Sequence, residues 1–80
     1  MTLVHNLKIN SEYFLPVKED LKSFEIRKND RDFHVGDLVI LNEFSPEKNI
    51  YSGEKITVKI KYITSYNQKK DFVVFGFTRV

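Results

Sequence analysis

Lys55-Ile56-Thr57-Val58-Lys59-Ile60-Lys61-Tyr62-Ile63 is the stretch that decides the fold of this 80-residue chain. Apolar and polar side chains alternate strictly along it, which predicts a strand with one buried and one solvated face. The apolar side chains predicted to share the buried face are those of Ile56, Val58, Ile60 and Tyr62. A half-buried strand of this length needs partner strands on its edges, so we expect a mainly β fold.

Four other segments have strand character. They are residues 5–9, 23–28, 38–44 and 72–78. Residues 38–41 are apolar at every position, which predicts burial on both faces of that strand. Gly76 indicates a β-bulge or a close backbone approach in the last strand. Polar residues at 29–32 and 45–49 predict turns, and Tyr51-Ser52-Gly53 predicts another.

One short helix is predicted early in the chain, starting at Asn10 or Ser11 and ending near residue 20. Either of these side chains can cap the first turn by accepting a hydrogen bond from a backbone N–H group. The helix's predicted buried stripe is Tyr13, Phe14 and Val17. Pro16 either kinks this helix or opens it at its first position, and we expect a single irregular helical segment. Five strands and one helix predict a small, partly closed β-barrel, an α+β fold in which residues 1–80 form a single domain.

Composition excludes several kinds of site. There is no cysteine, hence no disulfide, thiolate nucleophile or cysteine metal site, and two histidines make a histidine-rich metal site unexpected. Asp30 and Asp32 are interpreted as turn residues, so we expect neither metal nor cofactor. Residues 1–5 lack signal-peptide features, and no run approaches the roughly 20 apolar residues that cross a bilayer. We therefore expect a cytoplasmic protein without membrane association.

Charge is unevenly distributed along the chain. Residues 1–54 hold seven Lys and Arg against ten Asp and Glu, whereas residues 55–80 hold six against one. A basic segment of this kind can steer a polyanion towards the protein. The alternative reading is that lysines on the outward faces of strands keep the sheet edges soluble.

The segment most indicative of function is residues 22–31, KSFEIRKNDR. Phe24 and Ile26 alternate with Glu25 and Arg27, so we predict that the first two enter the core and the second two lie outside it. Carboxylate, guanidinium, amide and ammonium groups in one row suit a ligand with donors and acceptors, such as a nucleobase with its phosphate. A solvated edge strand has the same appearance.

Sequence templates for enzymes are absent, including Gly-rich phosphate loops, G-x-S-x-G and H-E-x-x-H. His5 is interpreted as a structural hydrogen-bonding residue and His34 as a solvated one. Lys22 and Glu25 form either an acid–base pair or a surface ion pair.

The chain resembles a small bacterial and phage family of unknown function related to the ASCH domains of the PUA-like superfamily. The matching residues are His5-x-Leu7-Lys8, Tyr13-Phe14, Lys22-x-Phe24-Glu25-Ile26-Arg27-Lys28-Asn29-Asp30-Arg31-x-Phe33-x-Val35-Gly36-Asp37 and Tyr51-x-Gly53. The resemblance implies a small β-barrel with a helix beside it and an RNA-binding cleft. By position it places Lys22, Glu25 and Arg27 in the cleft, with Lys28, Asn29 and Arg31 at the rim and His5 and Lys8 on the neighbouring strand. Asp20, where the family usually has Gly, and Pro16 depart from its pattern.

Some ASCH-like proteins are similar to amidohydrolases that act on acetylated cytidine through a Lys and a Thr. Lys22 matches the Lys, but Glu25 stands in the place of the Thr, which favours binding over catalysis. We therefore expect an RNA- or nucleotide-binding module. In it Arg27 makes a bidentate contact to phosphate or a base, Glu25 accepts from an exocyclic amine, and Lys22 neutralises phosphate.

Two further points stay open from the sequence. Tyr13 or Tyr51 could stack on a base, although core positions are the expected ones for both. A phage or bacterial protein-interaction module is the remaining alternative to RNA binding and hydrolysis, and the oligomeric state is not indicated.

Overall fold

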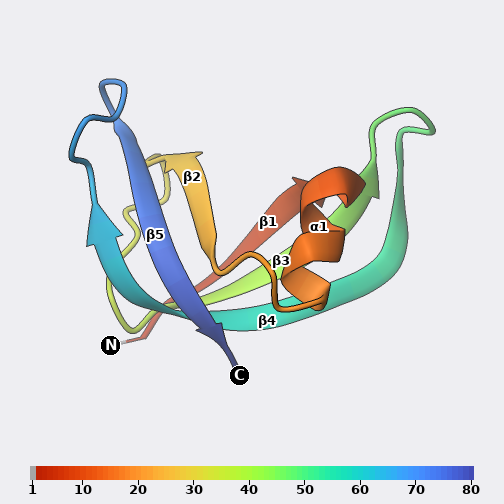
Figure 1. Ribbon diagram of the computed structural model, residues 1–80, viewed down its shortest axis with the longest axis horizontal. Helices are drawn as coiled ribbons and strands as arrows, with labels where there is room; N and C mark the ends of the chain where they lie inside the picture. Colours follow the sequence, from red (N-terminus) through yellow and green to blue (C-terminus); the bar gives the residue numbers. More distant parts are fainter. Residues whose placement is uncertain (1) are drawn as a thin grey trace.

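The computed structural model describes residues 2–80 as a five-stranded sheet curled into a half-barrel, with one short helix on its concave side (Figure 1). The elements are β1 (Val4–Asn10), α1 (Ser11–Lys18), β2 (Phe24–Lys28), β3 (Leu38–Ser45), β4 (Ile50–Thr64) and β5 (Phe72–Arg79). The strand order is β1-β3-β4-β5-β2, with β1 parallel to β3 and every other pair antiparallel. The predicted mainly β fold of five strands and one helix is confirmed, and the stretch 55–63 lies in the central strand, β4.

The two edge strands, β1 and β2, approach each other across the open side of the curl, which we call the seam. They are not neighbours in the sheet; two arginine side chains cross the seam instead. Arg27 donates from Nη2 to the carbonyl of Lys8 at 2.7 Å, and Arg31 donates from Nη1 to the carbonyl of Asn6 at 3.1 Å. Side chains therefore join the two edges where a closed barrel would use backbone hydrogen bonds.

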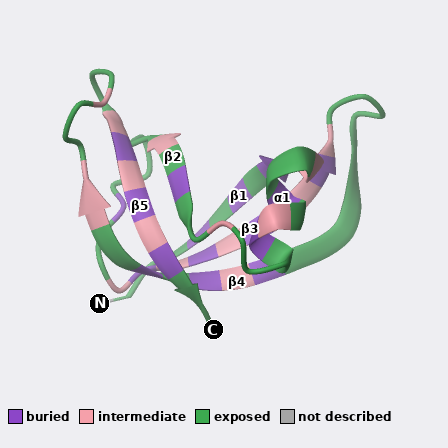
Figure 2. Ribbon diagram, in the orientation of Figure 1, coloured by how far each residue is buried: buried purple, intermediate pink, exposed green. Residues whose placement is uncertain are grey.

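The core fills the inside of the curl. Its buried apolar side chains come from β1, β3, β4 and β5, from α1 and from the β2–β3 loop (Figure 2). They are Leu7, Ile9, Phe14, Val17, Phe33, Val39, Leu41, Ile56, Val58, Ile60, Val73, Phe75 and Phe77. Fourteen per cent aromatic content supplies enough bulk to fill a core in so short a chain.

The alternation in β4 holds as far as Ile60 and then changes face. Tyr62 was predicted to share the buried face, but 66% of it is exposed. The register between β4 and β5 shifts between Ile60 and Tyr62, opposite Gly76, and Ile63 packs against the core instead. One extra residue in a strand reverses the face of every residue after it, so the bulge explains the error at Tyr62. The bulge lies in β4, opposite Gly76, and not in the last strand as predicted.

Two other strand predictions need correction. Residues 51–53 do not form a turn, because β4 already begins at Ile50; a register shift opposite Asn42 and Phe44 accommodates Gly53, whose φ is 91°. In β3, Val39 and Leu41 are buried while Leu38 and Ile40 are only half-buried. The second face of β3 is the outside of the curl, which nothing in the described residues covers completely.

Helix α1 is a single segment with Pro16 inside it, as expected. Asn10 occupies the N-cap position without a side-chain hydrogen bond, so the predicted side-chain cap is wrong. The helix ends two residues earlier than predicted, at Lys18. There Asp20 adopts a left-handed conformation with φ 61°, and the N–H of Leu21 donates to the carbonyl of Pro16 at 2.8 Å. This is the Schellman geometry that glycine usually provides, here with aspartate in glycine's place.

Only part of the predicted helical stripe is buried. Phe14 and Val17 are 1% exposed, whereas 49% of Tyr13 is exposed. Tyr13 faces away from the core, next to β2, so its prediction as a core residue is wrong.

No helix within residues 2–80 is long and apolar enough to cross a membrane.

Candidate ligand-binding cleft

The face of strand β2 that meets the core is not the predicted one. Glu25 is 5% exposed, whereas Phe24 and Ile26 are 44% and 53% exposed. A carboxylate can be buried at acceptable cost when cations and hydrogen-bond donors compensate it, and Glu25 has two such partners. The alternation was read correctly but assigned to the wrong faces.

The partners of Glu25 are Lys22 and Arg27. Lys22 donates from Nζ to Oε1 of Glu25, and Arg27 donates from Nε to Oε2 at 3.0 Å. The ammonium of Lys22 also lies 5.3 Å from the ring centroid of Tyr13 and 5.2 Å from that of Phe24. Cation–π attraction adds to the ion pair, so the lysine is held between two rings and a carboxylate. We call Lys22, Glu25 and Arg27 the charged triad; its formal net charge is +1.

The charged triad lies in a cleft between α1, β1 and β2. The cleft consists of two adjoining pockets of about 370 Å³ and 310 Å³ that share Tyr13, Glu25 and Ile26. Its lining residues are Lys8, Ile9, Asn10, Tyr13, Lys22, Phe24, Glu25, Ile26 and Arg27. Apolar walls with a few fixed polar groups are what a small planar ligand with a polar edge requires.

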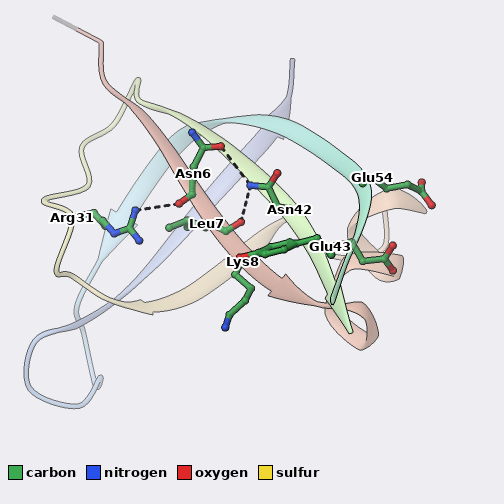
Figure 3. Close-up of a pocket in the computed structure, with 9 residues that line it drawn as sticks. Asn6, Leu7, Lys8, Arg31, Asn42, Glu43 and Glu54 are labelled. Carbon is green, nitrogen blue, oxygen red and sulfur yellow. Dashed lines mark hydrogen bonds between the residues drawn. The ribbon is translucent and has the colours of Figure 1, made fainter. Parts of the chain in front are cut away.

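Lys8, predicted on the strand next to the cleft, lies at its border, and Arg31, predicted at its rim, lies outside it. Lys8 lines both the cleft and a separate groove of about 510 Å³ over β1, β3 and the start of β4. In this groove Arg31 points to the carbonyl of Asn6, and the amide of Asn42 points to Asn6 and to the carbonyl of Leu7 (Figure 3). The groove thus begins where the cleft ends, at Lys8.

Tyr51 belongs to the same groove. It was predicted to be a core residue, but it is largely exposed and lies edge-on to Phe44, with 5.1 Å between ring centroids. Lys8 places its Nζ 4.5 Å from the centroid of Phe44. Glu43 and Glu54 also line the groove, so its positive and negative charges are balanced.

Lys28 and Asn29 lie at the other end of β2. Both line a pocket beside the connection between β4 and β5, away from α1. The Oδ1 of Asn29 accepts the N–H of Phe33 at 3.0 Å, which agrees with the predicted role of Asn29 in a turn. The structure therefore places the predicted site residues in three separate surface regions and in the core.

Comparison with known proteins identifies the family. Residues 4–77 match the family described as a domain of unknown function, DUF3850. This chain belongs to the DUF3850 family. A relative is the uncharacterized 12.9 kDa protein in the GpA 3′ region of Escherichia phage P2, which is 32% identical over 75 residues, covering 92% of this chain and 67% of that protein. The predicted membership of a small phage and bacterial family of unknown function is thereby supported.

In this DUF3850 domain His5 lies in the core and not with the charged triad. Its Nε2 lies 2.8 Å from Oδ2 of Asp37, and its ring packs edge-on against Phe33. Burial alone would raise the pKa of Asp37, but hydrogen bonds from His5 and from the N–H groups of Leu3 and His34 hold that pKa below its ordinary value. The pair joins the start of β1 to the loop before β3, so His5 has the structural role expected from the sequence.

Two rings, Tyr13 and Phe24, wall the cleft of the DUF3850 domain. Phe24 was predicted to lie in the core, and Tyr13 was expected there with stacking on a base as the alternative. The exposed fraction of each ring, which only the fold sets, reveals their position. Among residues 2–80 no group of three or more His, Cys, Asp or Glu side chains could hold a metal ion.

Proposed function

We propose that this domain binds RNA or a nucleotide, without catalysis, in the cleft between α1 and β2. One observation carries the proposal: a nearly buried carboxylate, Glu25, held between two cations in a cleft walled by exposed aromatic rings. A buried charge costs stability unless it is fully paired, and one that opens onto a cleft is a candidate for ligand recognition.

The cleft offers a nucleobase both of the contacts it needs. Tyr13 exposes about half of its surface, and stacking on such a ring contributes about 1–3 kcal/mol per base. Glu25 uses one hydrogen bond on each carboxylate oxygen, and each oxygen has a second lone pair that can accept from an exocyclic amine. Adenine, cytosine and guanine carry such an amine and uracil does not, so the proposal includes weaker binding of uracil.

Arg27 has a different role from the one inferred from sequence. Its Nε is bonded to Glu25 and its Nη2 to the carbonyl of Lys8, so a bidentate contact to a ligand would have to break both bonds. We assign Arg27 to positioning Glu25 and closing the seam. Lys22 is likewise engaged with Glu25, and the net charge of +1 on the charged triad supplies only general attraction for an anion.

We also propose that the domain is related to the ASCH domains of the PUA-like superfamily, the resemblance that implies RNA binding. A curled sheet with a helix beside its edge strands is the architecture that the resemblance implies, and the motif residues Lys22, Glu25 and Arg27 form one cluster.

The test is titration of labelled single-stranded RNA tetranucleotides with the wild type, Tyr13→Ala and Glu25→Gln, at two salt concentrations. We expect Tyr13→Ala to weaken binding roughly 5- to 150-fold, the equivalent of the stacking energy. Tyr62→Ala is the matched control, since Tyr62 is an exposed tyrosine that lines none of these pockets, and it should change the Kd by less than about twofold. Absence of binding by the wild type, or equal effects of the two tyrosine variants, contradicts the proposal.

A hydrolase acting on an acetylated cytidine-like nucleoside is the second candidate. The direct contact between Lys22 and Glu25 favours it, because a lysine and a carboxylate in contact can exchange a proton. Deacetylation assayed with the wild type and Lys22→Ala decides the question: a rate that the substitution abolishes supports hydrolysis, and no rate above buffer excludes it. A protein partner, the third reading, predicts co-purification of a protein and not RNA from cell lysate.

A further inference from the structure

A second pocket, at the far end of β2, is strongly basic. It has a volume of about 540 Å³ and lies between the end of β2 and the hairpin that joins β4 to β5; we call it the hairpin pocket. It is lined by Lys28, Asn29, Ser65, Gln68, Lys69, Lys70, Asp71, Phe72 and Val73. Three ammonium groups therefore face one carboxylate, that of Asp71.

The three lysines of the hairpin pocket differ from the two cations of the charged triad. Lys28, Lys69 and Lys70 have no acidic side chain within 4.0 Å among the described residues. Lys22 and Arg27, by contrast, share Glu25. Like charges gathered without counter-charges repel one another, and an anion bound among them would remove that repulsion.

Backbone hydrogen bonds hold the walls of the hairpin pocket in place. The N–H of Asn29 donates to the carbonyl of Asp71 at 2.7 Å, and the N–H of Phe72 donates to the carbonyl of Lys69 at 2.9 Å. The side chain of Asn29 accepts from Phe33 through its oxygen, which leaves the amide NH₂ group as a neutral donor at the rim. The hairpin is therefore docked on β2 and keeps its lysines next to Lys28.

Strand β2 connects the hairpin pocket to the cleft. Glu25 contributes to the cleft and Lys28, three residues later in the same strand, to the hairpin pocket. Three residues of extended strand span about 10 Å. Ile26 also lines the cleft and lies on the same face of β2 as Lys28, so an oligonucleotide that runs from Glu25 past Ile26 would place a neighbouring phosphate within reach of the hairpin lysines.

We propose that the hairpin pocket binds a backbone phosphate of the RNA whose base occupies the cleft. The inference rests on the proposed function and deepens it: the ligand is a single-stranded oligonucleotide and not an isolated nucleoside. The cleft needs such a site, because both cations of the charged triad are already bonded to Glu25. Base recognition and phosphate attraction are then divided between the two ends of β2.

The test compares Lys69→Glu/Lys70→Glu with Lys59→Glu/Lys61→Glu. Both double variants change the net charge equally at exposed lysines, but Lys59 and Lys61 lie on β4 outside the pockets described above. Each is titrated with an RNA tetranucleotide and, by chemical-shift perturbation, with cytidine, which carries no phosphate. Circular dichroism establishes that both variants are folded.

We expect the hairpin variant to bind the tetranucleotide at least about tenfold more weakly than the control variant, with cytidine binding unchanged. Its slope of log K against log salt should fall by about 0.7 for each lost phosphate contact. Equal tetranucleotide affinity in the two double variants contradicts phosphate binding by the hairpin pocket but does not contradict base binding in the cleft. Failure of the wild type to bind either probe overturns both.

Discussion

Asp37→Ala is expected to be among the most destabilising single substitutions in this domain. Asp37 is 3% exposed, and its carboxylate accepts hydrogen bonds from His5 Nε2 at 2.8 Å, from His34 N at 3.1 Å and from Leu3 N at 3.3 Å. Alanine would leave the buried His5 donor and the two partly buried N–H donors without this acceptor. The connection between the N-terminal strand and the loop before β3 would be lost with them.

The magnitude follows from these contacts. A hydrogen bond to a charged group contributes about 1.5–3 kcal/mol, and removing one partner of a buried ion pair costs about 3–5 kcal/mol. Since the Leu3 bond is long, we expect a loss near 3–4 kcal/mol. Domains of this kind have unfolding free energies of about 5–15 kcal/mol, so the variant would keep only part of its stability.

Urea denaturation at pH 7 measures this loss. With a slope of about 1.5 kcal/mol per molar urea, the midpoint should fall by about 2 M. Asp30→Ala is the matched control, because Asp30 lies in the same loop but is largely exposed, has no positive φ, and among residues 2–80 has a single ion pair, a 3.9 Å contact with Arg31. We expect the control to change the free energy of unfolding by less than about 0.5 kcal/mol.

The pH dependence gives a second measurement of the same interaction. The hydrogen bonds lower the pKa of Asp37 below its ordinary value of 3.8, so the folded chain binds this proton less readily than the unfolded chain. The contribution of ionised Asp37 to the free energy of unfolding is therefore complete above about pH 4. It is lost as the pH falls through the lower pKa of the folded chain. Asp37→Asn should lose less stability than the wild type between pH 5 and pH 2. A midpoint shift below about 0.5 M for Asp37→Ala, or parallel pH profiles for the wild type and Asp37→Asn, would refute the reasoning.

Two other predictions test the backbone geometry. Asp20→Gly should raise the free energy of unfolding by about 0.5 kcal/mol, because glycine adopts the left-handed conformation at φ 61° without strain; a thermal midpoint at or below that of the wild type would contradict this. Tyr62→Lys should change stability by less than about 0.5 kcal/mol, whereas Ile60→Lys, two residues earlier, should prevent folding, because the bulge between them moves Tyr62 to the exposed face. Comparison of the two variants by circular dichroism and urea denaturation decides the point, and equal destabilisation would place both side chains in the core.

Local pattern was enough to predict much of the fold. Alternation identified the central strand, β4, and strand character at residues 5–9 located β1. The helical spacing of Phe14 and Val17 located α1. These features depend on neighbours within a few residues, and the sequence contains those neighbours directly.

The local sequence pattern predicted the grouping of the charged triad but not which face of β2 is buried. The sequence indicated that Lys22, Glu25 and Arg27 belong together, and the structure places them in contact. The sequence did not indicate that Glu25 is buried and Phe24 exposed, since an alternating strand is consistent with either face turned inward. The choice between faces depends on partners that compensate a buried charge and on how much apolar surface other elements supply.

The sequence by itself therefore determined the kinds of elements, their order, the family and the segment most suited to bind a ligand. Only the tertiary structure decided which face of β2 is buried, that arginines and not backbone hydrogen bonds join the edges of the half-barrel, and that the basic residues of β2 serve two separate pockets. The physical reason is that the alternation of apolar and polar residues distinguishes the two faces of a strand without showing which face is buried. The curl of the whole sheet decides which of those faces meets the core.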